Sequence, residues 1–198
     1  MTHKPFFIAI EGLDGCGSST HSRILAAFLE GKGYNVHLTQ EPSKSEIGLL
    51  LRKFLKDKNI PPSVDALLFA ADRSIHYHKE IKEKLDAGYI VISDRYLESS
   101  IAYQSSQSDK ILPVWIEQIN KFVGLPDLTI VLDIDPKISL ARKTDEDLEK
   151  FENYSFLDKV RNLYLARAEQ EGYVVISSDD IIENVQDAIQ KIVIDKLK

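Results

Sequence analysis

An apolar segment followed by a run of glycines constrains the fold of this chain most strongly. Residues 6–10 are all apolar, Gly12, Gly15 and Gly17 follow within a few positions, and a helical pattern of apolar residues occupies 24–29. Gly12, Gly17 and Ser19 match the spacing G-x-x-x-x-G-K-[ST] of a Walker A loop, in which backbone N–H groups surround phosphates. A strand, a glycine turn and a helix N-terminus in this order direct N–H groups at an anion. The sequence therefore predicts a phosphate-binding loop.

The loop lacks the lysine of that pattern, because position 18 is serine. This lysine normally reaches the β- and γ-phosphates, so its loss should affect phosphoryl transfer more than nucleotide binding. A glycine turn without a ligand is the alternative, but the spacing, the hydroxyl pair and the flanking elements disfavour it. The residues expected to bind the phosphates of ATP are Gly12, Asp14, Gly15, Cys16, Gly17, Ser18, Ser19 and Thr20.

Apolar strand-like runs alternate with longer helical patterns along the rest of the chain. Strands are expected over residues 6–10, 36–39, 89–93, 128–134 and 173–176, and helices over 19–31, 47–56, 63–87, 113–123, 155–171 and 181–197. This alternation predicts one α/β domain over residues 1–198, with a five-stranded parallel sheet between two helical layers, as in P-loop NTPases. Such sheets bind ligands beyond the carboxyl ends of their strands, so polar clusters at those points are candidate sites.

Composition and charge exclude several classes of protein. The net charge of −6 disfavours an extended nucleic-acid surface, although a small anionic ligand needs only local cations. No apolar run approaches the roughly 18 residues of a membrane span, and the N-terminal segment lacks the apolar region of a signal peptide. The single cysteine, Cys16, fits a reducing compartment. We therefore expect a cytoplasmic protein that binds small molecules, with neither nucleic acid nor membrane as partner.

Two polar clusters follow the second and third expected strands. Glu41 and Pro42 form a stiff loop after the second strand, although a plain connecting turn would look the same. Asp94 and Arg95 come directly after the third, where an arginine can grip a phosphate and an aspartate can orient hydrated magnesium. An Asp–Arg pair that merely holds the loop is the alternative.

A third cluster lies within the helix expected over 63–87. Phe69 and Arg73 are four residues apart, so the ring and the guanidinium share one helix face. Together they can stack on a base and hydrogen-bond its edge. The alternative is a core phenylalanine covered by the arginine stem, which the spacing alone favours.

The chain resembles the thymidylate kinase family nearly from end to end. The resemblance is carried by FIAIEGLDGCGSST, TQEPS, LLFAADRSIH, DRYLESSIAYQ, LTIVLDIDP and EKFENYSFLDKVRNLY, in the family's order. LLFAADR and DRY..SS.AYQ are the specific segments, since phosphate loops occur in many families. The resemblance implies transfer of a phosphoryl group from ATP to dTMP with Mg²⁺ as cofactor, by a homodimer.

The resemblance also implies roles for residues around the acceptor nucleotide. Phe69 would stack on thymine, Arg73 would bond its edge, and Ser100 and Gln104 would lie near the base. Tyr103 would lie against the deoxyribose and leave little room for a 2′-hydroxyl.

Further implied roles concern the sugar, the phosphates and the metal. Asp14 would meet the 3′-hydroxyl, and Arg95 would bridge the acceptor and donor phosphates. Ser19 and Asp94 would hold magnesium, partly through water. The remaining residues expected in the monophosphate pocket are Glu41, Pro42, Arg52 and Ser99.

A lid over approximately 136–155 is implied as well. Family members with glycine at position 15 usually place arginines in this lid, whereas others carry an arginine in the loop. Here the lid offers only Arg142, Lys143 and Lys150 around an acidic run. We expect Arg142 or Lys143 to replace the missing loop lysine, so the expected catalytic residues are Asp94, Arg95, Arg142 and Lys143.

Two alternatives to a dTMP kinase stay open at this point. One is a kinase for another deoxynucleoside monophosphate such as dUMP, because one methyl group in an apolar pocket changes affinity by only about 1–3 kcal/mol. The other is a catalytically weakened, nucleotide-binding paralogue with a regulatory role. A complete acceptor cluster favours a working kinase, since a regulatory relic does not need one.

Overall fold

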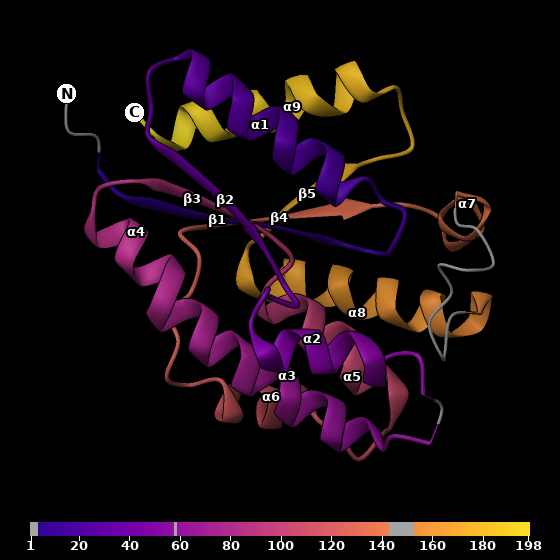
Figure 1. Ribbon diagram of the computed structural model, residues 1–198. Helices are drawn as coiled ribbons and strands as arrows, with labels where there is room; N and C mark the ends of the chain where they lie inside the picture. Colours follow the sequence, from indigo (N-terminus) through magenta and orange to yellow (C-terminus); the bar gives the residue numbers. More distant parts are fainter. Residues whose placement is uncertain (1–3, 58, 143–152) are drawn as a thin grey trace.

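The structure is a computed structural model that describes residues 4–57, 59–142 and 153–198. Its described residues form a parallel sheet between two helical layers (Figure 1). The strands are β1 Phe6–Gly12, β2 Val36–Gln40, β3 Ile90–Asp94, β4 Leu128–Asp133 and β5 Val174–Ser177. They lie in the order β2-β3-β1-β4-β5, and every pair is parallel. The predicted five-stranded α/β fold is therefore confirmed.

The helices cover both faces of this sheet. Helices α1 and α9 lie on one face, whereas α2 to α6 and α8 lie on the other, and α7 follows the carboxyl end of β4 (Figure 1). Their bounds are α1 Ser18–Gly31, α2 Glu46–Phe54, α3 Pro62–His76, α4 Lys82–Asp86, α5 Leu97–Gln107, α6 Pro113–Ile119, α7 Pro136–Ala141, α8 Tyr154–Glu171 and α9 Ile182–Lys196. A π-helical turn, η1 Tyr77–Ile81, joins α3 to α4.

The central strands owe their position to unbroken apolar runs. Along β1, β3 and β4 nearly every residue is buried, whereas the edge strand β2 has only half-buried and exposed positions and β5 has a single buried one. Continuous burial is typical of parallel strands covered on both faces. Because β1 lies between β3 and β4, the ends of these three strands meet at one edge of the sheet, where Gly12 and Asp94 terminate β1 and β3.

The helix boundaries show where the sequence prediction was incomplete. The helix expected over 113–123 ends at Ile119, and the one expected over 63–87 contains the π-helical turn. Helices α5 and α7 were not predicted. Most of α5 is buried on all sides, so it lacks the polar face that marks a surface helix. Helix α7 begins at a local signal, since the Asp135 carboxylate caps it by accepting from the Lys137 N–H at 2.7 Å.

The sheet and the helices enclose the hydrophobic core. One of its clusters packs Phe7 and Val91 of the sheet against Ile101 of α5 and Ile116 of α6. This packing fixes α5 next to the carboxyl ends of β1 and β3. Within the described part of the chain, no helix is both long enough and apolar enough to span a membrane.

Candidate active site

The loop between β1 and α1 is the segment predicted to surround phosphates. Gly12, Gly15 and Gly17 have φ values of 150°, 79° and 95°, which residues with a side chain rarely adopt. A Cβ on Gly12 would lie 2.5 Å from the Leu132 carbonyl oxygen, and one on Gly15 would lie 2.9 Å from that of Ser139. The backbone of β4 and α7 therefore approaches the loop so closely that these positions require glycine.

A cavity of about 210 Å³ opens on this loop. It is lined by residues from the loop, from the first turn of α1 and from the end of β3, namely Asp14, Gly15, Gly17, Ser18, Ser19, Thr20 and Arg95. Two of the residues predicted to bind phosphate, Gly12 and Cys16, are not among its lining residues. The Cys16 side chain is buried below the loop, where burial raises the pKa of its thiol to about 11. Gly12 and Cys16 thus stabilise the conformation of the loop by packing beneath it, without lining the cavity.

The expected magnesium residues, Ser19 and Asp94, lie in direct contact. The Ser19 hydroxyl donates to Oδ2 of Asp94. The other carboxylate oxygen, Oδ1, is buried and has no hydrogen-bond partner among the described residues. A buried acceptor without a donor, next to a hydroxyl group, fits the oxygen ligands and bound waters that Mg²⁺ prefers. These two residues therefore suit the metal that the family resemblance implies.

Arg95 occupies the junction between the phosphate loop and a second cavity. Its backbone has a φ of 68° and its N–H donates to the Ile10 carbonyl oxygen at 2.9 Å. The guanidinium donates to the Gly12 carbonyl oxygen at 2.9 Å and forms an ion pair with Asp14. Burial lowers the pKa of Arg95, but Asp14, Tyr103, Tyr164 and Cys16 together raise it by more, so the net pKa is well above its ordinary value. The group is therefore a fixed cation.

The second cavity, about 110 Å³ in volume, collects most of the residues predicted to bind the acceptor. Those that line it are Asp14, Glu41, Pro42, Phe69, Arg73, Arg95, Ser99, Tyr103 and Gln104. Leu55, Tyr96 and Gln107 also line it and were not predicted. The polar spacing of Gln104 and Gln107 along one helix face would have identified Gln107, had α5 been recognised as a helix.

Two predicted substrate residues do not line this cavity. The Ser100 hydroxyl accepts a hydrogen bond from Nη2 of Arg73 at 2.8 Å, so it holds the Arg73 side chain rather than facing the cavity. Arg52 donates to the backbone carbonyl oxygens of Ser43, at 2.6 Å, and of Pro42. Its guanidinium therefore holds the loop after β2, and the prediction that it lines the pocket does not agree with this geometry.

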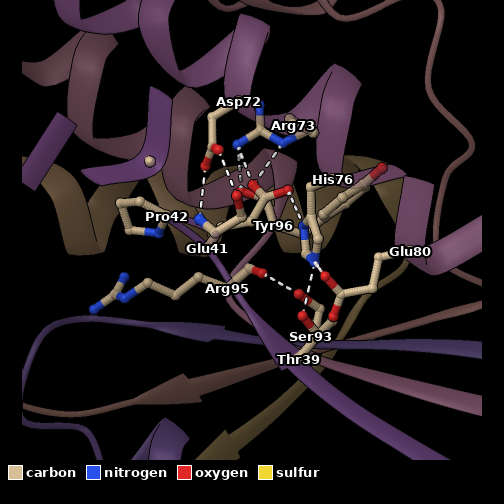
Figure 2. A network of polar contacts seen from close by, with 12 residues as sticks. Thr39, Glu41, Pro42, Asp72, Arg73, His76, Glu80, Ser93, Arg95 and Tyr96 are labelled. Atoms are coloured by element: carbon tan, nitrogen blue, oxygen red, sulfur yellow. Dashed lines mark hydrogen bonds and ion pairs between the residues drawn. The ribbon is translucent and has the colours of Figure 1, made fainter. Parts of the chain in front are cut away.

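The Arg73 guanidinium is fixed by a buried network (Figure 2). Only 1% of the residue is exposed, and its Nε donates to Oε2 of Glu41 at 2.8 Å. Nη1 donates to the side-chain oxygen of Asn120 at 2.8 Å, and Nη2 reaches the Tyr96 carbonyl oxygen at 3.1 Å. Its stem does not simply cover a core phenylalanine, as the alternative interpretation required. Sequence reasoning missed Asn120, because nothing local links it to a residue so distant in the chain.

Glu11 is a further buried group that sequence reasoning missed. Its carboxylate accepts from the Tyr96 N–H at 2.9 Å and from the Ser99 hydroxyl at 2.5 Å. Burial raises its pKa from 4.5 to about 7 and outweighs the lowering effects of Ser99 and Arg95. The group therefore supports the turn that carries Arg95. A glutamate in an otherwise apolar strand was the available signal.

The segment expected to form a lid is described only at its two ends, in α7 and at the start of α8. Arg142 donates to the carbonyl oxygens of Gly15 at 3.2 Å and Ser178 at 3.5 Å, so it connects the phosphate loop to the loop after β5. It does not line the phosphate cavity. The other two candidate cations of the lid, Lys143 and Lys150, lie outside the described residues.

Comparison with known proteins agrees with this geometry. A family model described as thymidylate kinase matches residues 10–189. A probable thymidylate kinase of Pyrobaculum aerophilum is 47% identical over 193 residues, covering 94% of this chain and 97% of the relative. One of Caldivirga maquilingensis is 45% identical and covers 97% and 95%, and one of Staphylothermus marinus is 38% identical and covers 97% and 96%. The chain therefore belongs to the thymidylate kinase family.

Proposed function

We propose that this protein transfers the γ-phosphoryl group of ATP to dTMP and so produces dTDP and ADP. The observation that carries the proposal is the position of Arg95, whose side chain lines both the phosphate-loop cavity and the acceptor cavity. A donor phosphate in the first cavity and an acceptor phosphate in the second would meet at this guanidinium. The family and its relatives support dTMP as the acceptor, and they support neither dUMP nor a purely regulatory role.

The phosphate loop is suited to the donor. Its N–H groups and the N-terminus of α1 would receive the β- and γ-phosphates of ATP. Ser19 and Asp94 would hold Mg²⁺, which supplies positive charge to the phosphate oxygens. Ser18 can donate one hydrogen bond but carries no charge.

The acceptor cavity is suited to a pyrimidine deoxynucleotide. Phe69 offers a flat ring at its wall, and Arg73 offers a rigid donor group. The Tyr103 hydroxyl accepts from the Asp14 N–H at 3.0 Å, and the Arg95 guanidinium lies 5.4 Å from the centre of the Tyr103 ring. Tyr103 therefore lies between the base end and the phosphate end of the cavity. A deoxyribose would lie against its ring.

Phosphoryl transfer requires positioning and cations around the transferring group rather than covalent chemistry by the protein. We propose that Arg95 supplies most of this charge and that Arg142 supplies more when ATP is bound, since its guanidinium already contacts the phosphate loop at Gly15. Lys143 and Lys150 are further candidates. An arginine that stabilises the transferring group accounts for about 10³–10⁵ in rate.

A coupled assay of ADP release tests the proposal with ATP, Mg²⁺ and a panel of dTMP, dUMP, dCMP and dGMP. We expect turnover with dTMP to exceed turnover with every other acceptor. Arg142→Ala should lower kcat, whereas its matched control Lys137→Ala, an exposed cation five residues earlier in α7, should not. Ser18→Lys should raise kcat. Absence of turnover with all four acceptors, together with measurable ATP binding by calorimetry, would refute a kinase function.

The assembly and the location are proposals as well. The family resemblance supports a homodimer in the cytoplasm. Light scattering of the purified protein would give a mass of twice 22.5 kDa if the dimer forms.

A further inference from the structure

The imidazole of His76 is buried behind the acceptor cavity and is not part of the machinery described above. His76 is the last residue of α3, and only 2% of it is exposed. Its two ring nitrogens face Glu41 on one side and Thr39 of β2 on the other (Figure 2). A buried histidine with a partner at each nitrogen has a fixed orientation.

His76 and Arg73 divide one carboxylate between them. Nδ1 of His76 lies 3.1 Å from Oε1 of Glu41, and Nε of Arg73 lies 2.8 Å from Oε2. Since Glu41 is 5% exposed, water contributes little to holding it. A carboxylate anchored at both oxygens cannot rotate about its last bond, whereas one anchored at a single oxygen can. The plane of the Glu41 carboxylate therefore depends on His76. This carboxylate is one of the partners that hold the Arg73 guanidinium, together with Asn120 and the Tyr96 carbonyl oxygen.

The contact between His76 and Glu41 does not depend on the charge of the ring. The carboxylate only accepts, so Nδ1 carries the hydrogen. Nε2 lies 2.7 Å from the Thr39 hydroxyl, which can donate to a neutral ring or accept from a charged one and which also hydrogen-bonds to Glu80. Glu80 lies farther away, with an oxygen 3.8 Å from Nε2. Both protonation states of the ring thus keep the same donor on Glu41.

The helix presents these groups together. Arg73, His76 and Glu80 are three and four residues apart, so they share the helix face that looks toward Glu41 and β2. The helix changes to π-helical hydrogen bonding directly after His76, over Tyr77–Ile81. Such π-helical turns are frequent at functional sites.

We propose that His76 is a positioning residue for the acceptor nucleotide. It fixes the Glu41 carboxylate, one of the partners that hold the Arg73 guanidinium toward the base, and it thereby tunes the affinity for dTMP without touching ATP or the transferred phosphoryl group. This inference rests on the proposed function, because it takes the cavity of Phe69 and Arg73 as the dTMP site.

A pair of substitutions separates this role from a structural one. In His76→Asn the amide nitrogen takes the place of Nδ1 and keeps a donor for Glu41, whereas in His76→Gln it takes the place of Nε2 and reaches Thr39 instead. Glutamine has the higher helix propensity. If His76 served only stability, His76→Gln would be the milder variant. If it positions Glu41, His76→Asn is the milder one.

The measurement is steady-state kinetics with dTMP and ATP varied in turn, together with thermal unfolding of each variant. We expect His76→Gln to raise the KM for dTMP by about tenfold, the loss of one hydrogen bond to a charged group, with unchanged kcat and KM for ATP. His76→Asn should stay close to the wild type. His78→Gln, an exposed histidine two positions further on, is the matched control and should change nothing.

Each contrary outcome has a distinct meaning. An unchanged KM for dTMP in His76→Gln would overturn the inference, and so would equal increases in both KM values that follow the loss of thermal stability. A wild-type protein without dTMP turnover would instead refute the proposed function. In that case calorimetric titration of dTMP into the same variants tests His76 directly, since the expected order of affinities is unchanged.

Discussion

Replacing Glu11 by glutamine should remove much of the pH dependence of this protein's stability near neutral pH. Glu11 is fully buried beneath the turn that carries Arg95. Burial raises its pKa from 4.5 to about 7, whereas the hydrogen bond from Ser99 and the charge of Arg95 lower it, and the charge of Glu98 raises it further. The folded protein thus binds a proton that the unfolded chain releases at lower pH.

The sign and size of the effect follow from this difference. Below about pH 4.5 the carboxyl is protonated in both states, and above about pH 7 it is ionised in both, so stability falls as the pH rises through this window. A difference of one unit in pKa corresponds to about 1.4 kcal/mol, so the free energy of unfolding should drop by about 3 kcal/mol across the window. Glutamine cannot ionise, and its Oε1 can still accept from the Tyr96 N–H.

Urea unfolding monitored by circular dichroism at about pH 5 and about pH 8 measures this difference. Other titrating groups contribute equally to wild type and variant, so the difference between the two pH dependences isolates Glu11. We expect the wild type to lose about 3 kcal/mol more than Glu11→Gln between the two conditions. Glu183→Gln, an exposed carboxyl in the first turn of α9, is the control and should follow the wild type. Parallel pH dependences for wild type and Glu11→Gln would refute the argument.

Three further predictions concern buried or crowded groups. Arg167→Ala should lower the free energy of unfolding by about 3–5 kcal/mol, because it leaves the buried Glu98 carboxylate without its bidentate partner, and urea unfolding measures this. Gly48→Ala should destabilise by about 1–3 kcal/mol and raise the KM for dTMP, since its Cβ would lie 2.2 Å from the Ser43 carbonyl oxygen. Cys16 should react with a thiol reagent only after unfolding, because its thiol is 1% exposed and has a pKa of about 11, which a colorimetric thiol assay with and without urea would check.

The strands of this fold could be predicted because their signal is local. A parallel strand covered on both faces is a mostly apolar run; residues 6–10 are all apolar, and residues 128–134 are apolar except for Thr129 and Asp133. Helix α5 could not be found in the same way. From Leu97 to Gln104 its residues are buried whatever their polarity, so burial there reflects the neighbouring α8 and β1 rather than an amphipathic pattern.

The position of the candidate site could be predicted for a related reason. Parallel strands place their carboxyl ends at one edge, so the segments after β1, β2 and β3 had to converge, and Asp14, Glu41 and Arg95 do line one cavity. The hydrogen-bond partners inside the site could not be predicted. Asn120 reaches Arg73 because α6 packs beside α3, and that packing depends on side chains throughout the core.

The missing loop lysine affects the charge of the site more than its shape. Residues from other elements hold the phosphate loop in place. The Ser139 hydroxyl donates to the Asp14 carbonyl oxygen at 2.6 Å, and the Arg95 guanidinium donates to the Gly12 carbonyl oxygen at 2.9 Å. Among the described residues, no hydrogen bond to the loop uses the Ser18 side chain. A cradle built this way keeps its N–H groups in place with serine or lysine. If the shape of the loop is the same with either residue at position 18, the positive charge near the γ-phosphate of ATP can come from another element. Arg95 is suited to supply it, because it lines the same cavity.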